Sequence, residues 1–128
     1  MENEIVEKPD YVEELVNLIR SGEPDEGISE KIDNYHDNDI ASALDELNEK
    51  ERKKLYQILG VERMSEIFAY VDDVGKYLEE IELEKAADII ENMDADDAVD
   101  VLEEVDETKR KQLIELMDEE SKEDIKLI

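Results

Sequence analysis

The chain has 128 residues and a formal net charge of −26, from 41 Asp and Glu residues against 15 Lys and Arg residues. This balance argues against a nucleic-acid-binding protein, because phosphate contacts need clustered Lys and Arg in a positive field. The absence of cysteine excludes disulfides and thiolate zinc sites. Hydrophobic residues make up 40% of the chain, with only 4 Gly and 2 Pro, so the composition favours a folded, all-α domain over disorder.

The first part of the chain predicts two helices joined by a loop. Residues 1–9 are acidic and resemble neither a secretory signal nor a transit peptide, so we interpret them as an N-terminal extension. Apolar residues at helical spacing predict a helix over residues 10–20. Three Gly or Pro residues within residues 21–27 predict a loop, and a short helix is expected over residues 28–35. The longest apolar run, residues 67–71, is too short to cross a membrane, so no direct membrane insertion is expected.

From Ile40 onward the sequence repeats with a period of 12 residues, apart from one step of 10 after Met64. Apolar residues occupy the first, fourth, fifth and eighth positions of the strong copies, which begin at Ile40, Met64, Ala86 and Ala98. This spacing covers one face of about two and a half helical turns, so each copy predicts one short helix. Because such a helix is unstable alone, its apolar face must stack on its neighbours. We therefore predict an α-solenoid, or superhelix, of about ten short helices built on this repeat.

The ninth position of the pattern is Asp or Asn, where one helix ends and the next begins. A side-chain oxygen there can accept a hydrogen bond from the first turn of the following helix. We therefore predict helix N-caps at Asn48, Asp72, Asp94, Asp106 and Asp118. Asn48 together with Glu51 also fits a capping box.

Two segments resemble a known family. His36-Asp-Asn-Asp-Ile-Ala41 resembles the opening His-Pro-x-Asp-Ile-Ala motif of the cytosolic N-terminal domain of MgtE-type magnesium transporters, with Asp37 in place of Pro. Residues 85–90 and 96–104 resemble later repeats of the same domain. The resemblance implies an MgtE N-type superhelical domain over residues 10–128. In the family, paired CBS domains, a linking helix and a membrane bundle follow this domain, and this chain contains none of them.

The resemblance implies a regulatory, magnesium-sensing role at the cytoplasmic face of the membrane. In the family, Mg2+ ions bridge acidic surfaces of the N domain and the CBS domains, and docking favours the closed pore. Mg2+ prefers carboxylate oxygens and keeps much of its water, so weak binding shared with a neighbouring domain is expected. A surface this acidic also repels a second acidic surface until cations bridge or screen it. The chain, an excised fragment or a stand-alone relative of the domain, is expected to be soluble and to transport nothing alone, and any homodimer would form through the rest of a transporter.

The resemblance places metal-facing acids at Glu66, Asp96 and Asp100, with Asp97 adjacent. Asp96 and Asp100 are four residues apart and share one helix face. The alternative interpretation of these acids is a solvated helix face. The positive helix N-terminus would then simply stabilise the negative charges of Asp96 and Asp97.

The sequence contains no recognisable catalytic motif. His36 is the only histidine, and there is neither a nucleophile motif nor a Gly-rich phosphate loop, so we predict that the chain is not an enzyme. We expect His36 to lie at a helix start, and the basic clusters at residues 50–54 and 109–111 to neutralise neighbouring acidic helices. The competing function is an acidic helical-repeat adaptor without an ion role, similar to the armadillo-like modules of the flagellar switch protein FliG. Magnesium promotes a bridged interface, whereas any salt weakens the docking of a basic partner.

Overall fold

The computed structural model describes residues 10–126, and over that range the chain forms nine α-helices and no strand. The all-α prediction is therefore confirmed, while the predicted N-terminal extension lies outside the described residues. The helices are α1 (Tyr11–Arg20), α2 (Asp25–Ile32), α3 (Asp37–Leu44), α4 (Glu49–Phe68), α5 (Val74–Leu78), α6 (Leu83–Glu91), α7 (Ala95–Glu104), α8 (Glu107–Glu115) and α9 (Glu119–Lys126). The loop predicted over residues 21–27 is too long, because Asp25 and the two residues after it form the first turn of α2.

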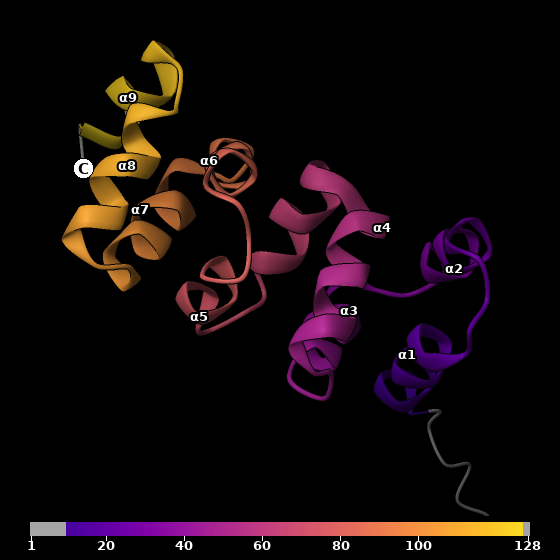
Figure 1. The fold of residues 1–128 in the computed structure, drawn as a ribbon. Helices are drawn as coiled ribbons and strands as arrows, with labels where there is room; N and C mark the ends of the chain where they lie inside the picture. The colour runs from indigo at the N-terminus through magenta and orange to yellow at the C-terminus, as the bar shows by residue number, and fades with distance from the viewer. Residues whose placement is uncertain (1–9, 127–128) are drawn as a thin grey trace, which may run out of the picture.

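The helices follow one another along an elongated body, from α1 at one end to α9 at the other (Figure 1). Most helices pack against a helix that is not their immediate neighbour in sequence, as in the pairs α1 with α3, α2 with α4, α4 with α6, α5 with α7, α6 with α8 and α7 with α9. Each short helix therefore buries its apolar face between its neighbours, as marginal isolated helices require. His36 stands at the N-cap position of α3, as predicted.

Helix α4 is interrupted at Gly60, whose φ of 79° and ψ of 171° are not helical. This region of backbone space is essentially restricted to glycine. The interruption leaves two helical segments, residues 49–59 and 61–68. The sequence pattern had separate copies here, and Gly60 provides the turn between them.

Replacing Gly60 by Ala is expected to destabilise the domain by about 1 to 3 kcal/mol, because any side chain is strained at this backbone conformation. Space is not the cause, since no atom lies within 4 Å of a Cβ at this position. Gly27→Ala, in helix α2, is the control: its Cβ would meet the carboxylate of Glu23 at 3.2 Å, and because that flexible side chain can shift, we expect a change of less than about 1 kcal/mol. Urea unfolding of both variants checks this, and equal stabilities would contradict the assigned strain.

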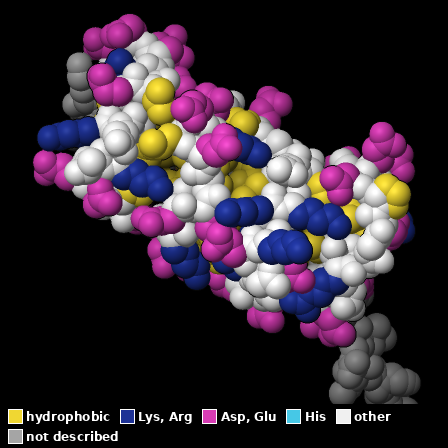
Figure 2. Space-filling view, viewed as in Figure 1, with side chains coloured by type: hydrophobic (Ala, Val, Ile, Leu, Met, Phe, Trp, Pro, Cys, Tyr) yellow, Lys and Arg dark blue, Asp and Glu magenta, His cyan; other side chains and the backbone are white. Residues whose placement is uncertain are grey.

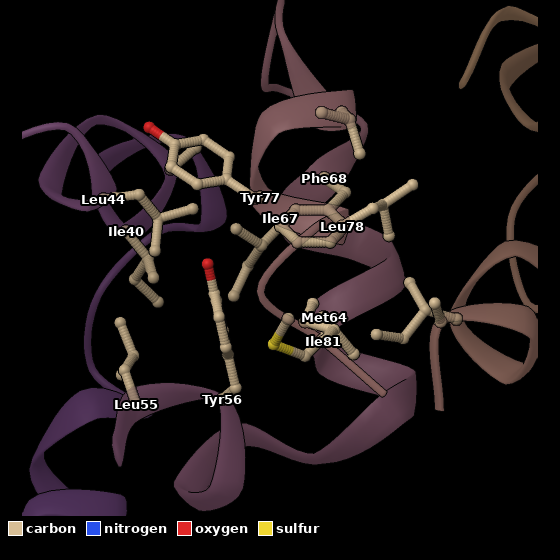
Figure 3. Close-up of a cluster of buried hydrophobic side chains, with 14 of the residues drawn as sticks. Ile40, Leu44, Leu55, Tyr56, Met64, Ile67, Phe68, Tyr77, Leu78 and Ile81 are labelled. Carbon is tan, nitrogen blue, oxygen red and sulfur yellow. The ribbon is translucent and has the colours of Figure 1, made fainter. Parts of the chain in front are cut away.

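The central part of the core joins α3, α4 and α5 (Figure 3). Phe68 is almost completely buried, and its ring lies between those of Tyr56 and Tyr77, at centroid distances of 6.4 Å from each. Buried side chains outside this part continue the core from α1 to α8, and they include Leu15, Ile28, Ile89 and Leu113. One hydrophobic core therefore runs along the described part of the chain.

An ion pair is enclosed beside these aromatic rings. Arg52 Nε donates to both carboxylate oxygens of Glu80 at 3.0 Å, and the hydroxyl of Tyr56 donates to Glu80 Oε2 at 2.9 Å. The side chains of Arg52 and Glu80 are only 17% and 10% exposed. Burial opposes ionisation of Glu80, but the hydrogen bonds from Arg52 and Tyr56 hold its pKa below the ordinary value. The pair ties the start of α4 to the end of α5.

A second buried tyrosine completes this polar network. The hydroxyl of Tyr77 donates to Asp45 Oδ1, and this hydrogen bond lowers the pKa of Asp45. The guanidinium of Arg52 lies 5.4 Å from the centroid of the Tyr77 ring, within cation–π range. Both tyrosines therefore bury their rings while their hydroxyls reach carboxylates, as buried tyrosines generally require.

Three of the five predicted N-caps are confirmed. Asn48, Asp106 and Asp118 each accept a hydrogen bond from the backbone amide three residues further on, at 2.9, 2.8 and 2.8 Å. Asn48 also forms the predicted capping box with Glu51, whose side chain accepts from the Asn48 amide at 2.9 Å. These oxygens satisfy donors that have no partner within the helix.

The other two cap predictions are corrected. Asp73, not Asp72, occupies the N-cap position of α5, and it makes no side-chain capping bond. Instead, the amide of Gly75 donates to Glu104 Oε1 from α7 at 3.1 Å, so a neighbouring helix supplies the acceptor. Asp94 occupies the N-cap position of α7 without a side-chain capping bond. The Asp94 carboxylate therefore does not cap α7.

The prediction that the basic clusters at residues 50–54 and 109–111 neutralise neighbouring acidic helices is only partly confirmed. Arg52 neutralises Glu80 across helices, but several other cations donate to main-chain carbonyls: Lys54 to Ile19, Lys109 to Leu78, and Arg110 to Leu102 and Val105. Cations near helix C-termini interact favourably with the exposed carbonyls and the helix dipole. In Figure 2, Lys and Arg side chains form a band along the visible face, interleaved with Asp and Glu. These cations mainly hold helix ends together.

Candidate functional site

Four carboxylates line a hollow of about 340 Å³ between α3, α4 and α7. We call it the acidic hollow and define it by Asp37, Glu66, Asp94 and Asp97. Its remaining lining residues are Ser65, Ala69, Tyr70, Asn92 and Met93. Neither Lys nor Arg is among the residues that line it.

Each of these carboxylates is positioned by a helix start or by the second segment of α4. Asp37 is the first residue of α3, Asp94 precedes α7, and Asp97 lies in the first turn of α7. Glu66 is exposed and projects from α4 after the Gly60 interruption. The positive ends of the α3 and α7 dipoles favour negative charge at these positions. The fold thus gathers acids from segments separated by up to sixty residues of sequence on one side of the molecule.

A second hollow, of about 520 Å³, adjoins the first and shares Asp37 and Glu66 with it. It contains Arg63, whose Nε donates to Asp37 Oδ1 at 2.7 Å and whose terminal nitrogens donate to Asp33 Oδ1 at 3.2 Å and to the Tyr35 carbonyl at 3.0 Å. One end of the acidic surface is therefore compensated by a cation of the chain itself. At the end formed by Asp94 and Asp97, no Lys or Arg of residues 10–126 lines the hollow.

The structure separates the four acids expected to face a metal into two pairs. Glu66 and Asp97 line the acidic hollow together. Asp96 and Asp100 are exposed on α7 and are not among the lining residues. Asp94 was predicted only as a cap and Asp37 only as a departure from a motif, so the sequence did not identify either as part of the site. The signal for Asp94 was its position immediately before the acids of α7.

The chemistry of the hollow fits a hydrated divalent cation better than a caged one. Carboxylate oxygens are the ligands that Mg2+ prefers, and Mg2+ commonly keeps several of its waters. Over residues 10–126, however, no three His, Cys, Asp or Glu side chains are close enough together to hold a metal ion. The four carboxylates therefore do not form a metal site by themselves.

No helix within the described residues is long and apolar enough to span a bilayer.

Comparisons with known proteins agree with this architecture. Residues 35–128 match the family model described as the MgtE intracellular N domain. The fold is similar to a crystal structure of the soluble part of a magnesium transporter, with a TM-score of 0.82 and 23% sequence identity over 92% of this chain. This chain covers 47% of that structure, about half of its length. A comparison with curated protein sequences finds no match.

Proposed function

Because the chain belongs to the family of the MgtE intracellular N domain, we propose that it is the magnesium-sensing regulatory domain of a magnesium transporter. This membership also bears out the expectation that the chain is not an enzyme. In the proposed mechanism the domain lies at the cytoplasmic face of the membrane and docks on CBS domains of the same transporter. Docking through Mg2+-bridged acidic surfaces favours the closed pore, and dimerisation depends on the rest of the transporter.

The observation that carries this proposal is the acidic hollow, which Glu66, Asp94 and Asp97 line and which no Lys or Arg within residues 10–126 lines. A partner surface that is also acidic would be repelled from this end at low ion concentration. Divalent ions that bind between the two surfaces reverse the repulsion, so their concentration sets the docked fraction. Asp96 and Asp100, on the exposed part of α7, add to the same field and are proposed to contact ions less closely.

We propose further that the helices form a short superhelical solenoid on a 12-residue repeat. The helical segments begin at Asp37, Glu49, Val61, Val74, Leu83, Ala95, Glu107 and Glu119, and five of the seven steps between these starts are 12 residues, which supports the repeat. Solenoids offer long exposed surfaces for partners. The acidic hollow lies on such a surface, to which α3, the second segment of α4 and the start of α7 contribute acids.

Divalent ions should stabilise the isolated chain by more than general screening of its charges does. Ions that bind the folded state raise its stability by mass action, so the melting temperature should rise more in MgCl2 than in NaCl of matched ionic strength. Thermal melts followed by circular dichroism test this, with CaCl2 as a second divalent ion. Equal shifts in all three salts would mean general screening and would remove the support for a specific ion role.

A further inference from the structure

We propose that a hollow between α1 and α2 binds an arginine side chain from an extended segment of a partner protein. The hollow measures about 450 Å³ and lies at the end of the body formed by these two helices (Figure 1). We call it the α1–α2 hollow, and the residues that line it are Glu14, Asn17, Leu18, Lys31, Asn34 and Tyr35. It shares no lining residue with the acidic hollow, so binding there is separate from the proposed ion-dependent docking.

The α1–α2 hollow presents one carboxylate whose charge is available to a partner. Its cation, Lys31, is already compensated, because Nζ donates to both carboxylate oxygens of Glu23 at 2.8 and 2.9 Å. Glu14 is exposed, and the hydroxyl of Tyr35 donates to its Oε1 at 2.8 Å. This hydrogen bond and burial raise the pKa of Tyr35, so the hydroxyl remains a donor at neutral pH. A neutral group thus orients the Glu14 carboxylate without cancelling its charge.

Two aromatic rings adjoin this carboxylate. The rings of Tyr11 and Tyr35 meet edge to face, with their centroids 6.0 Å apart. Tyr11 is 45% exposed, whereas Tyr56 and Tyr77 are buried. A guanidinium is attracted to the face of an aromatic ring and can pair with a carboxylate at the same time. Arginine suits this combination better than lysine, because its planar group stacks on rings and is more weakly hydrated.

Two asparagines extend the recognition from a side chain to a peptide. Asn17 in α1 and Asn34 just after α2 are both exposed and line the α1–α2 hollow. Each side-chain amide carries donors and an acceptor, so it can bind the N–H and C=O groups that an extended backbone leaves unpaired. The net charge of −26 attracts a basic segment and repels an acidic one. These features together favour an arginine within an extended peptide over a free cation.

The test titrates the isotopically labelled chain with a blocked pentapeptide, Ala-Pro-Arg-Pro-Ala, whose prolines keep it extended. NMR signals of the side-chain amides of Asn17 and Asn34 and of the backbone amide of Tyr35 should shift, with a weak, millimolar affinity. The same peptide with Gln in place of Arg should bind about three- to thirtyfold more weakly, because it lacks both the cation–π contact and the ion pair. The peptide with Lys in that place should bind with an intermediate affinity.

Four variants locate the binding. Glu14→Gln should weaken binding of the Arg peptide about two- to fivefold through the lost ion pair. Tyr11→Leu, which keeps an apolar side chain, should weaken it by a similar factor, about two- to fivefold, through the lost ring. Glu13→Gln is the matched control for charge, because Glu13 is exposed on the same helix but does not line the α1–α2 hollow. Tyr70→Leu is the control for an exposed tyrosine, and both controls should bind like the parent.

The peptide comparison uses the parent chain, so it does not depend on how any variant folds. Absence of shifts, equal affinities for the Arg and Gln peptides, or shifts spread over the acidic surface instead of the α1–α2 hollow would overturn the proposal. Equal weakening in Glu14→Gln and Glu13→Gln would also overturn it, because only net charge would then matter. The titrations contain no divalent ion, so their failure would leave the proposed magnesium-dependent docking unaffected.

Discussion

Replacing Glu80 by Gln is expected to lower the free energy of unfolding by about 2 kcal/mol, because it removes the charged acceptor of the part-buried hydrogen bonds from Arg52 and Tyr56. The variant keeps the shape of the side chain but leaves the charge of Arg52 enclosed beside Tyr56 and Tyr77. The adjacent residue provides a control, because Glu79 is exposed and Glu79→Gln should change stability by less than about 0.5 kcal/mol. Urea unfolding of both variants measures the difference.

A double-mutant cycle with Arg52→Met then separates the ion pair from other effects of each substitution. If Glu80→Gln and Glu79→Gln are equally stable, the enclosed pair does not contribute to the fold as described. If the effects of Arg52→Met and Glu80→Gln simply add, the two side chains act independently, which would contradict the network.

The stability difference between the parent and Glu80→Gln should also depend on pH. The folded state holds the pKa of Glu80 below its ordinary value, so the stabilisation is fully present above the unfolded-state pKa of about 4.3. It is lost as the pH falls through the lower folded-state pKa, because the carboxylate then binds a proton in both states. The two proteins should therefore converge in stability at acidic pH, and a constant difference down to acid unfolding would contradict this linkage.

Neutralising Glu66 and Asp97 together should have the largest effect on ion-dependent docking. In the intact transporter, Glu66→Gln with Asp97→Asn should raise the magnesium midpoint of docking severalfold, because both carboxylates line the hollow that no Lys or Arg lines. Limited proteolysis across the junction after this domain, at a series of MgCl2 concentrations, reports the midpoint.

Asp96→Asn with Asp100→Asn is the matched control, since it removes the same charge from the same part of the molecule. We expect a smaller shift, because these side chains lie on the exposed part of α7 outside the hollow. Identical shifts in the two double variants would mean that only net charge matters. If both double variants show the same magnesium dependence of protease protection as the parent, these four acids are only part of a solvated surface.

Much of the architecture could be predicted because each helix leaves a local signal. The apolar spacing predicted the helices from α3 to α9, and the side chain of Asn48 could be paired with Glu51 from sequence alone. The interruption of α4 follows from Gly60, but its backbone conformation depends on how the two segments pack. Asp72 was assigned as a cap because α5 starts one residue later than the pattern implied.

The site was harder to predict, because its residues meet only through tertiary packing. Nothing in the sequence pattern linked Tyr56, Tyr77 and Glu80, yet they form one network with Arg52. Asp94 looked like a cap, but its helix makes no use of the carboxylate. Whether an acid caps a helix, faces a partner or pairs with a cation depends on neighbours that are distant in sequence.

Magnesium-dependent docking on CBS domains is the central claim, and its most direct measurement is the protease protection of the junction after this domain in the intact transporter. We expect MgCl2 to raise the protection of the junction against protease in a saturable way, whereas NaCl at the same ionic strength should not raise it. Protection that falls equally in MgCl2 and NaCl would indicate docking on a basic surface, and protection that is independent of both salts would also contradict the magnesium-bridged mechanism.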